Sequence, residues 1–363
     1  MTDRVYNFSA GPAVLPVPVL EEAQKNLLSL PGVGMSVLES SHRSPHFTEI
    51  IETAEANLRN LLNVPDNYSL LFLQGGASLQ FSMIAINFLG GTEKPADYIL
   101  TGSWGKKAIK EAKREGTVNV AWDGADGNYN RVPEASELKL SDDATYVHFT
   151  SNETIQGVEF PVEPSVGDTP LVCDSSSDIL SRPIDIAKYD LLYAGAQKNM
   201  GPSGVTFVAI SDRMLGKAPE QMHALLDYNL MAENKSLYNT PPTFGVYLVM
   251  LVTKWLIEEI GGLEQMAVIN KQKASMLYDA IDESGGFYKG HAQLKSRSNM
   301  NVTWTLETPE LEKEFLDEAK KQGLCELKGH RSVGGIRASI YNAMPVEGVT
   351  KLRDFMATFK ESH

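Results

Sequence analysis

Short apolar runs separated by polar and glycine-rich turns dominate the middle of the chain. Runs this short indicate buried strands when Gly or Pro bounds them. Strands are expected near residues 70, 98, 118, 146, 171, 191 and 205, alternating with helices or short turns. That alternation is typical of a mostly parallel sheet with helices on both faces. The pattern therefore predicts an α/β fold built on a seven-stranded sheet.

The last two runs predict an exception to the parallel pairing. Leu191–Ala194 and Val205–Ile210 flank an insert that is too short for the crossover that parallel strands require. We expect this pair to be antiparallel. Further along, Tyr238–Pro242 precedes a long predicted helix, Phe244–Ile260. The two prolines suit a helix entry, which makes Asn239 or Thr240 the expected cap.

After Gly261-Gly262 the pattern changes to a mixture of helices and strands that is typical of a smaller α+β domain. The helices expected there are Leu263–Ser284, Pro309–Gln322 and Lys351–Lys360, and the strands are Met300–Thr305, Leu324–Leu327 and Gly335–Ile340. We divide the chain into a large domain, 17–258, and a small domain, 259–363, which also takes the N-terminal segment 1–16.

Lys198 is the candidate reactive residue. It lies in the insert between the two antiparallel runs, among glycines and small residues that leave room for a planar ligand. A partly desolvated lysine loses some of its preference for the charged form, and its neutral amine can form a Schiff base with a carbonyl. Asp174 ends the apolar run Pro170–Cys173 upstream and could pair with the pyridinium nitrogen of pyridoxal phosphate. Taken singly, the lysine could snorkel out of a loop and the aspartate could cap a turn.

A glycine pair predicts a phosphate cradle. Gly75-Gly76 joins the strand Leu70–Leu73 to a helix expected over Leu79–Leu89. Free backbone N–H groups and a helix dipole at such a junction favour an anion. A simple turn is the alternative.

Further polar and aromatic side chains follow other strands, where open α/β sheets bind ligands. Trp104 follows the strand at Tyr98–Leu100 and could face a flat ring, although it could equally be structural. Thr154 belongs to a polar stretch after Tyr146–Phe149. His42 and Arg43 form a possible anion clamp in a turn. Arg337 alternates with apolar residues in a strand, so it requires an anionic ligand or a structural ion pair.

Composition narrows the class of protein. Apolar residues make up 42% and charged residues 22% of the 363 residues, as in soluble globular enzymes. A net charge of −13 argues against nucleic-acid and acidic-membrane partners. The two cysteines, Cys173 and Cys325, provide neither a disulfide framework nor a metal cluster, so we expect no metal. The start of the sequence lacks a signal-peptide pattern, and no run is long enough for a membrane span, which favours a cytoplasmic protein.

Several of these stretches, taken together and in order, resemble the phosphoserine aminotransferases, a family of class-V pyridoxal-phosphate enzymes. The matching stretches are Asn7–Ala13, Ser41-His42-Arg43, Gly75–Ser78, Asn152–Ile155, Gln197-Lys198-Asn199, Tyr238–Pro241 and Gly329-His330-Arg331. The resemblance implies the aspartate-aminotransferase fold (PLP fold type I), pyridoxal 5'-phosphate as cofactor, and a homodimer. It also implies reversible amino transfer between L-glutamate and 3-phosphohydroxypyruvate, giving O-phospho-L-serine and 2-oxoglutarate in serine biosynthesis. Whether 4-phosphohydroxy-L-threonine of pyridoxine biosynthesis is also a substrate stays open.

The resemblance also implies roles for individual residues. Lys198 is similar to the Schiff-base lysine, Asp174 to the pyridinium partner and Trp104 to the ring-stacking residue. Further cofactor contacts are implied for Ala77, Ser78, Thr154 and Gln197, and for Asn239 and Thr240 toward the cofactor phosphate of the neighbouring subunit. Substrate contacts are implied for Arg337, at the α-carboxylate, and for His42, Arg43, His330 and Arg331, at the distal anion.

One position departs from part of the family, and other functions remain as alternatives. Some members carry an arginine where this chain has Ser78, but backbone N–H groups would still make the phosphate cradle. Another fold-type-I enzyme is possible, such as a cysteine desulfurase or an alanine-glyoxylate-type aminotransferase. A desulfurase needs a nucleophilic cysteine on a mobile loop, and neither Cys173 nor Cys325 is placed for that. A non-enzymatic ligand-binding protein with the same fold is a further alternative, in which Lys198 and Asp174 would have no catalytic role.

Overall fold

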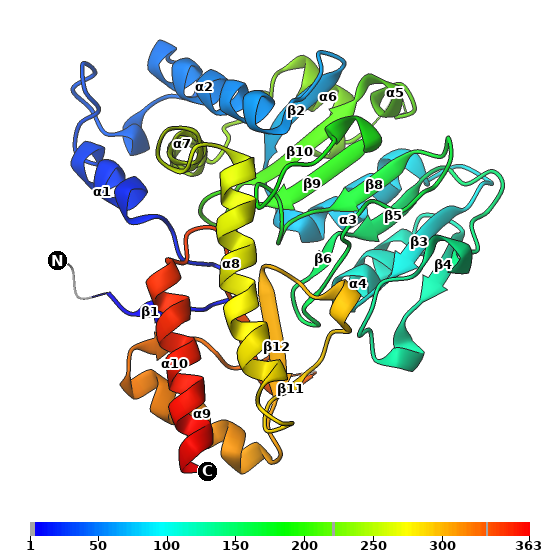
Figure 1. The fold of residues 1–363 in the computed structure, drawn as a ribbon. Coiled ribbons are helices and arrows are strands. Elements are labelled where there is room, and N and C mark those ends of the chain that lie inside the picture. Colours follow the sequence, from blue (N-terminus) through cyan, green and yellow to red (C-terminus); the bar gives the residue numbers. More distant parts are fainter. Residues whose placement is uncertain (1–3, 220–221, 332) are drawn as a thin grey trace.

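A computed structural model describes residues 4–219, 222–331 and 333–363. Its centre is one seven-stranded sheet with the strand order β2-β10-β9-β8-β5-β3-β4 (Figure 1). The strands, in chain order, are β2 Tyr68–Leu73, β3 Ala96–Leu100, β4 Val118–Asp123, β5 Val147–Thr150, β8 Leu171–Asp174, β9 Leu191–Gly195 and β10 Thr206–Ser211. The predicted α/β fold with a seven-stranded sheet is therefore confirmed.

Strand β10 pairs antiparallel with both of its neighbours, and the other pairs in this sheet are parallel. The antiparallel pairing of β9 with β10 was predicted from the short link between them. Parallel strands place their carboxyl ends at one edge of a sheet, so the residues after β3, β5 and β8 meet there.

Helices cover both faces of the sheet. Along β2, Leu70 and Phe72 belong to one apolar cluster, whereas Leu71 and Leu73 belong to another, because successive side chains of a strand point to opposite faces. The first cluster includes α1 Val17–Asn26, α2 Pro45–Leu62 and α7 Thr243–Trp255. The second includes α3 Gly76–Phe88, α4 Ser103–Ala112, α5 Asp212–Leu215 and α6 Tyr228–Glu233.

The C-terminal part contains a third apolar core. Its helices are α8 Leu263–Asp282, α9 Pro309–Lys321 and α10 Val346–Ser362, and its three-stranded antiparallel sheet consists of β11 Lys289–Gly290, β12 Asn301–Thr305 and β14 Ile336–Ser339. Figure 1 shows this part below the main sheet, with α8 running between the two.

The N-terminal segment joins this C-terminal part. Strand β1 Tyr6–Asn7 pairs in parallel with β13 Leu324–Cys325, and Phe8 is buried in the third core. This placement favours grouping the first residues with the small domain, although the domain limits at 16/17 and 258/259 stay predictions. A small hairpin, β6 Asn152–Glu153 with β7 Val158–Glu159, follows β5.

Two helix starts differ from the sequence prediction by three residues or more. Helix α3 begins at Gly76 instead of Leu79, directly after the glycine pair, and α10 begins at Val346 instead of Lys351. Pro345 at the N-cap of α10 provides the extended entry that sequence spacing did not reveal.

The prediction that Asn239 or Thr240 caps α7 was wrong. The N-cap is Pro242, and no side-chain hydrogen bond caps the helix. A residue before proline favours extended backbone, so two consecutive prolines keep Thr240 away from the first helical N–H groups. Asn239 and Thr240 are consequently available for other contacts.

Among the described helices, none is long and apolar enough to cross a membrane.

Candidate active site

Lys198 lies at the edge of the sheet where the parallel strands end. Its side chain is buried, with 8% exposed, and Nζ donates a hydrogen bond to Thr154 Oγ1 at 2.6 Å. Thr154 follows β6, and Lys198 follows β9 after a two-residue turn. Two residues predicted for the site are thus in direct contact although 44 positions separate them.

Burial lowers the pKa of Lys198 to about 8, against the opposing effect of the Asp174 and Glu153 carboxylates. Arg337 lowers this pKa further, so the guanidinium lies close to the lysine. A lysine with such a pKa is partly neutral near physiological pH, which a nucleophile or a proton acceptor requires.

Asp174 ends β8 and is buried. Its Oδ1 accepts hydrogen bonds from Ser176 Oγ at 2.6 Å and from the Ser176 N–H at 3.0 Å. Burial raises the pKa of Asp174, while the Ser176 hydroxyl and Lys198 act in the opposite direction. Ser176 Oγ in turn accepts from the Gly195 N–H at 3.1 Å, which ties the end of β8 to the end of β9.

Trp104 lies in the first turn of α4 beside Lys198. The lysine Nζ is 5.6 Å from the centroid of the indole, and Lys107 Nζ is 3.8 Å from it. The indole Nε1 is buried, yet no hydrogen-bond partner for it exists among the described residues. A buried donor without a partner is costly in a protein interior, so this N–H favours a bound group at the indole.

The glycine pair forms the start of α3. Gly75 has a φ of 88°, and a Cβ atom there would lie 2.5 Å from Leu79 Cδ2, so only glycine fits. The N–H groups of Gly76, Ala77 and Ser78 donate to no acceptor within the described ranges. Three free N–H groups at a helix start constitute the expected anion cradle.

The turn that carries Asn239 and Thr240 lies beside this cradle. Asn239 Nδ2 donates to Gln74 Oε1 at 3.3 Å, and Gln74 Nε2 donates to the Thr240 carbonyl at 2.9 Å. Thr240 Oγ1 is 3.3 Å from His42 Nδ1, and the neighbouring Arg43 is exposed. The structure therefore groups the predicted residues His42, Asn239 and Thr240 around Gln74.

Arg337 and the 330–331 turn form a second group of cations. Burial lowers the pKa of Arg337, and no carboxylate of the described residues forms an ion pair with it. The pKa of His330 is lowered by burial and then by Arg337, Lys107 and Arg331, so the charges of these three residues reach His330. The structural ion pair considered for Arg337 is absent from the described part of the chain, which favours the anionic ligand.

Gln197 contacts the N-terminal segment, Asn7–Ala13. Its carbonyl accepts a hydrogen bond from the Ala13 N–H at 2.8 Å. A Cβ atom on Gly11 would lie 3.6 Å from the side chains of both Gln197 and Lys198. The stretch Asn7–Ala13 therefore packs against the lysine turn.

Sequence reasoning missed two residues of this site, Glu153 and Lys107. Glu153 was noted only as part of a polar stretch after β5, yet it is fully buried and contacts the start of α4. Lys107 gave no signal beyond its position one helical turn after Trp104. The only sequence signal for Glu153 was its position in the polar stretch after β5. The residues that it contacts lie some fifty positions away in the sequence.

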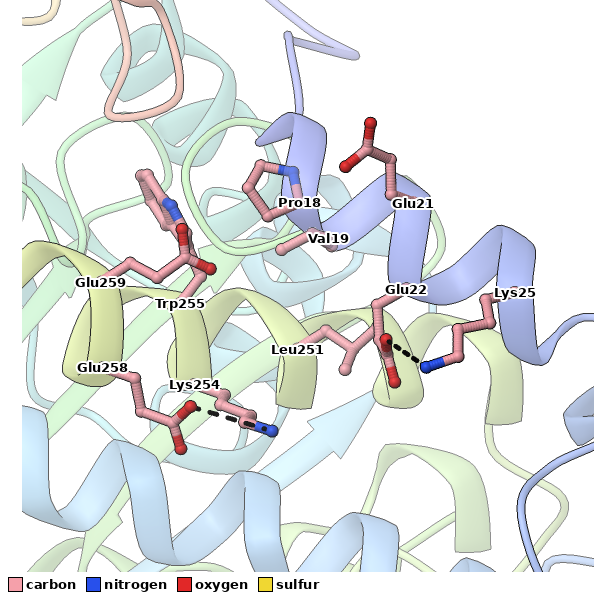
Figure 2. Close-up of a pocket in the computed structure, with 10 residues that line it drawn as sticks. All are labelled: Pro18, Val19, Glu21, Glu22, Lys25, Leu251, Lys254, Trp255, Glu258 and Glu259. Carbon is pink, nitrogen blue, oxygen red and sulfur yellow. Dashed lines mark ion pairs between the residues drawn. The ribbon is translucent and has the colours of Figure 1, made fainter.

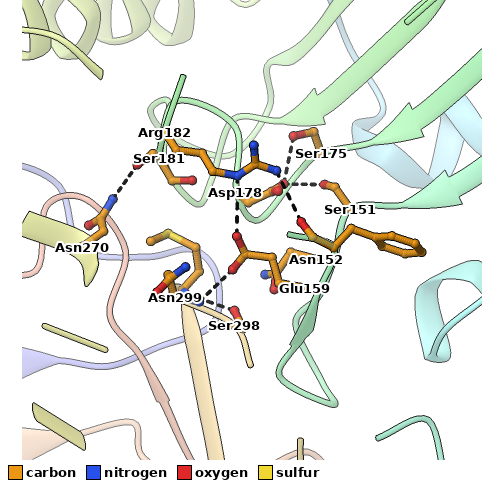
Figure 3. Close-up of polar contacts among 12 residues, drawn as sticks. Ser151, Asn152, Glu159, Ser175, Asp178, Ser181, Arg182, Asn270, Ser298 and Asn299 are labelled. Carbon is orange, nitrogen blue, oxygen red and sulfur yellow. Dashed lines mark hydrogen bonds and ion pairs between the residues drawn. The ribbon is translucent and has the colours of Figure 1, made fainter. Parts of the chain in front are cut away.

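A buried polar network fixes the strand ends that carry the site (Figure 3). Asp178 Oδ1 accepts hydrogen bonds from Ser151 Oγ at 2.5 Å and Ser175 Oγ at 2.8 Å. Glu159 lies next to this group, 3.7 Å from Arg182 Nε, and accepts from the Asn299 N–H at 2.7 Å. The network joins the ends of β5 and β8 to the segment before β12, and so to the C-terminal part.

A separate pocket of about 340 Å³ lies between α1 and α7 (Figure 2). Two ion pairs, Lys25–Glu22 and Lys254–Glu258, line it. None of the residues predicted for the site lines this pocket. This pocket is therefore distinct from the Lys198 edge of the sheet, where the predicted residues gather.

Comparisons with known proteins agree with this geometry. The family model of aminotransferase class-V matches residues 5–352. A phosphoserine aminotransferase of Rhodopirellula baltica is 54% identical over 358 residues, covering 98% of this chain and 95% of the relative. Another, of Halalkalibacterium halodurans, is 54% identical over 360 residues and covers 99% of each chain.

Solved structures give the same result. A phosphoserine aminotransferase of Bacillus circulans subsp. alkalophilus superposes with a TM-score of 0.97 at 50% identity, over 99% of both chains. A PLP-bound phosphoserine aminotransferase of Trichomonas vaginalis has a TM-score of 0.92 at 42% identity, over 98% of this chain and 100% of the other. An alanine–glyoxylate aminotransferase of a Nostoc species, at 18% identity and a TM-score of 0.79, shares the fold over 99% of this chain and 96% of the other.

Proposed function

The chain belongs to the class-V aminotransferases, and we propose on that basis that it transfers an amino group reversibly between L-glutamate and 3-phosphohydroxypyruvate. The products are O-phospho-L-serine and 2-oxoglutarate, in serine biosynthesis. The observation that carries the proposal is the buried Lys198 amine, held by Thr154 and flanked by Asp174, Trp104 and an arginine without a carboxylate partner. This arrangement serves amino transfer on an anionic substrate.

The cofactor is pyridoxal phosphate. When bound, it supplies an aldehyde that reacts with amines and a pyridine ring that accepts electrons. The site residues fit it: the free N–H groups of Gly76–Ser78 suit its phosphate, the Trp104 indole suits its ring and the buried Asp174 suits its ring nitrogen. We assign Lys198 to the covalent link and Thr154 and Gln197 to further contacts.

Lys198 is the group that moves protons. A pKa of about 8 lets Nζ accept the proton from the Cα of the substrate and release it again at neutral pH. Thr154 accepts from Nζ and so holds the amine in one orientation. Burial of the lysine keeps bulk water away from this proton.

Two cationic groups account for the choice of substrate. Glutamate and phosphoserine both carry an α-carboxylate and a second anion at the far end. We assign Arg337 to the α-carboxylate, because it lies near Lys198, and His330 with Arg331 to the distal anion. The same cations would suit 4-phosphohydroxy-L-threonine, which we propose as a second substrate to be tested.

We propose that the enzyme is a homodimer with shared active sites. Asn239 and Thr240 do not cap α7, and Thr240 contacts His42, so these residues and Arg43 form one unit. In a two-fold dimer this unit would reach the cofactor phosphate and the distal anion of the neighbouring subunit. We also propose that the enzyme acts in the cytoplasm.

The geometry does not favour a cysteine desulfurase. Cys173 is fully buried in β8, and burial raises the pKa of its thiol well above the ordinary value. A thiol in that state is a poor nucleophile.

The test is an assay of the purified protein with pyridoxal phosphate. We expect a visible absorption band from the bound cofactor and amino transfer from glutamate to 3-phosphohydroxypyruvate. Unphosphorylated serine should be a much poorer donor than phosphoserine. Equal turnover of serine and phosphoserine, or binding of cofactor without any amino transfer, would contradict the proposed function.

A further inference from the structure

Glu153 is buried at the end of β6 and contacts the start of α4. Its Oε2 accepts the backbone N–H of Trp104 at 3.0 Å, and its Oε1 accepts that of Gly105 at 2.9 Å. The N-cap residue of α4 is Gly102, which has no side chain to cap the helix. Glu153 therefore supplies, from another element, the acceptors that the first turn of α4 requires.

Gln156 completes this arrangement. Its Oε1 accepts the Ser103 N–H at 3.3 Å, and its Nε2 donates to Ser103 Oγ at 2.9 Å. Gly102 allows the close approach, since a Cβ atom there would lie 2.5 Å from Glu153 Cδ. The first turn of α4, which carries Trp104, is thus held by two side chains of the β6–β7 hairpin.

The same hairpin also holds the reactive lysine. Thr154 lies between Glu153 and Gln156 in sequence, and its hydroxyl accepts the hydrogen bond from Lys198 Nζ. Glu153, which accepts the backbone N–H of Trp104, and Thr154, which accepts from the Lys198 amine, are therefore adjacent in sequence. A shift of this hairpin would displace both Trp104 and Lys198.

Glu153 also contributes charge. The charges that act on Lys198 are those of Asp174 on β8, Glu153 on β6 and Arg337 on β14, with a smaller effect from Asp178. The Glu153 carboxylate favours the charged form of Lys198, whereas Arg337 and burial oppose it. Burial raises the pKa of Glu153 itself to about 7, so it is largely ionised above that pH.

We propose that Glu153 is a positioning residue of the active site: its carboxylate fixes the turn that carries Trp104, and its negative charge helps Lys198 to hold a proton. The inference rests on the proposed function, in which Lys198 must both accept and release a proton. Without this carboxylate, desolvation and Arg337 would favour the neutral amine more strongly.

The test measures the titration of Lys198 in the protein without cofactor. Competitive acetylation with acetic anhydride over a range of pH, followed by mass spectrometry of the peptide that contains Lys198, gives the pH midpoint of its reactivity. For Glu153→Gln we expect this midpoint to fall by about one pH unit. Glu153→Asp keeps the charge and should stay near the wild-type midpoint.

Gln156→Ala is the matched control. It removes the tether to Ser103 without changing charge, so the Lys198 midpoint should not move. If Glu153→Gln leaves the midpoint at its wild-type value, or if Gln156→Ala lowers it equally, the inference is overturned. Should Glu153→Gln not fold, Gly102→Ala replaces it, since the added Cβ displaces the carboxylate. An unchanged midpoint in folded Gly102→Ala likewise overturns the inference.

These measurements are independent of the proposed function, because they require neither cofactor nor substrate. Wild-type protein that fails to transfer amino groups would overturn the proposed function, whatever the midpoints show. Wild-type activity combined with an unchanged midpoint in Glu153→Gln would overturn only the role of Glu153.

Discussion

The side-chain amine of Lys273 donates a hydrogen bond to the backbone carbonyl of Tyr341 at 2.7 Å, inside the core of the C-terminal part. The same group donates to the carbonyls of Ile340 at 3.0 Å and Met344 at 3.1 Å. The loop after β14 therefore wraps around the buried Lys273 amine, whose pKa burial lowers to about 7. Within that loop, the Asn342 N–H donates to Asn199 Oδ1 at 3.0 Å, directly beside Lys198 in sequence. Lys273 thus holds the loop that joins the C-terminal part to the lysine turn.

We predict that Lys273→Met destabilises the protein strongly. The variant leaves several buried carbonyl oxygens without a donor, each of which costs about 1–3 kcal/mol, so a loss on the order of 3 kcal/mol is expected. Urea unfolding measures it. Lys271→Met, an exposed position on the same helix, should stay within about 0.5 kcal/mol of the wild type. A similar loss of unfolding free energy in both variants would show that the hydrogen bonds of Lys273 do not stabilise the fold.

Arg337 and Arg331 should differ in their effects on substrates. Arg337→Ala should impair amino transfer from every amino acid, because all of them carry the α-carboxylate. Arg331→Ala should impair phosphoserine and spare alanine. Loss of one charge-assisted contact costs about 1.5–3 kcal/mol. The measurement is kcat/KM for phosphoserine and alanine in each variant. Equal losses for both substrates in Arg331→Ala would contradict the division of roles.

Glu159 should make the stability of the protein depend on pH. Burial and the nearby Asp178 raise its pKa above the ordinary value of 4.5, whereas Asn299 and Arg182 oppose that change. The folded protein therefore holds a proton that the unfolded chain has already released, so the free energy of unfolding falls as the pH rises from about 4.5 through the raised pKa.

Glu159→Gln removes this contribution. Urea unfolding at pH 5 and pH 8 should show a smaller pH-dependent difference in the variant than in the wild type, whatever the absolute stability of the variant. An identical difference in the two proteins would mean that the carboxyl of Glu159 titrates normally.

Mixed dimers test the sharing of the active site. Lys198→Ala chains lack the reactive amine, and chains with Asn239→Ala and Thr240→Ala lack the contacts that we assign to the neighbouring subunit. In a mixed dimer both lesions fall on one site and the other site is intact. Co-refolding the two variants should therefore restore activity. If mixed dimers form and no activity returns, the turn serves its own subunit.

Much of the fold could be predicted from the sequence because its signals are local. Short apolar runs bounded by glycine and proline located the strands, and the length of the link between β9 and β10 determined their antiparallel pairing. Asp174 was singled out because it ends such a run; the structure buries it near Lys198, and its pairing with the cofactor ring stays a prediction. Residues that directly follow parallel strands lie together, because those strands end at the same edge of the sheet.

The errors and omissions arose where distant segments meet. Asn239 and Thr240 were expected to cap α7, but the following prolines hold them away from it and beside Gln74. Glu153 could not be assigned, because its partners are backbone N–H groups of another element. Lys273 is an ordinary helix residue in sequence, and only the loop after β14 gives it acceptors.

The residue that binds the cofactor covalently can be located directly. Wild-type protein is incubated with pyridoxal phosphate, reduced with borohydride, digested and examined by mass spectrometry. We predict that the added mass is confined to the peptide containing Lys198, and that Lys198→Ala carries none there and turns over at background rates. Stable labelling of a different lysine, with amino transfer retained in Lys198→Ala, would contradict it.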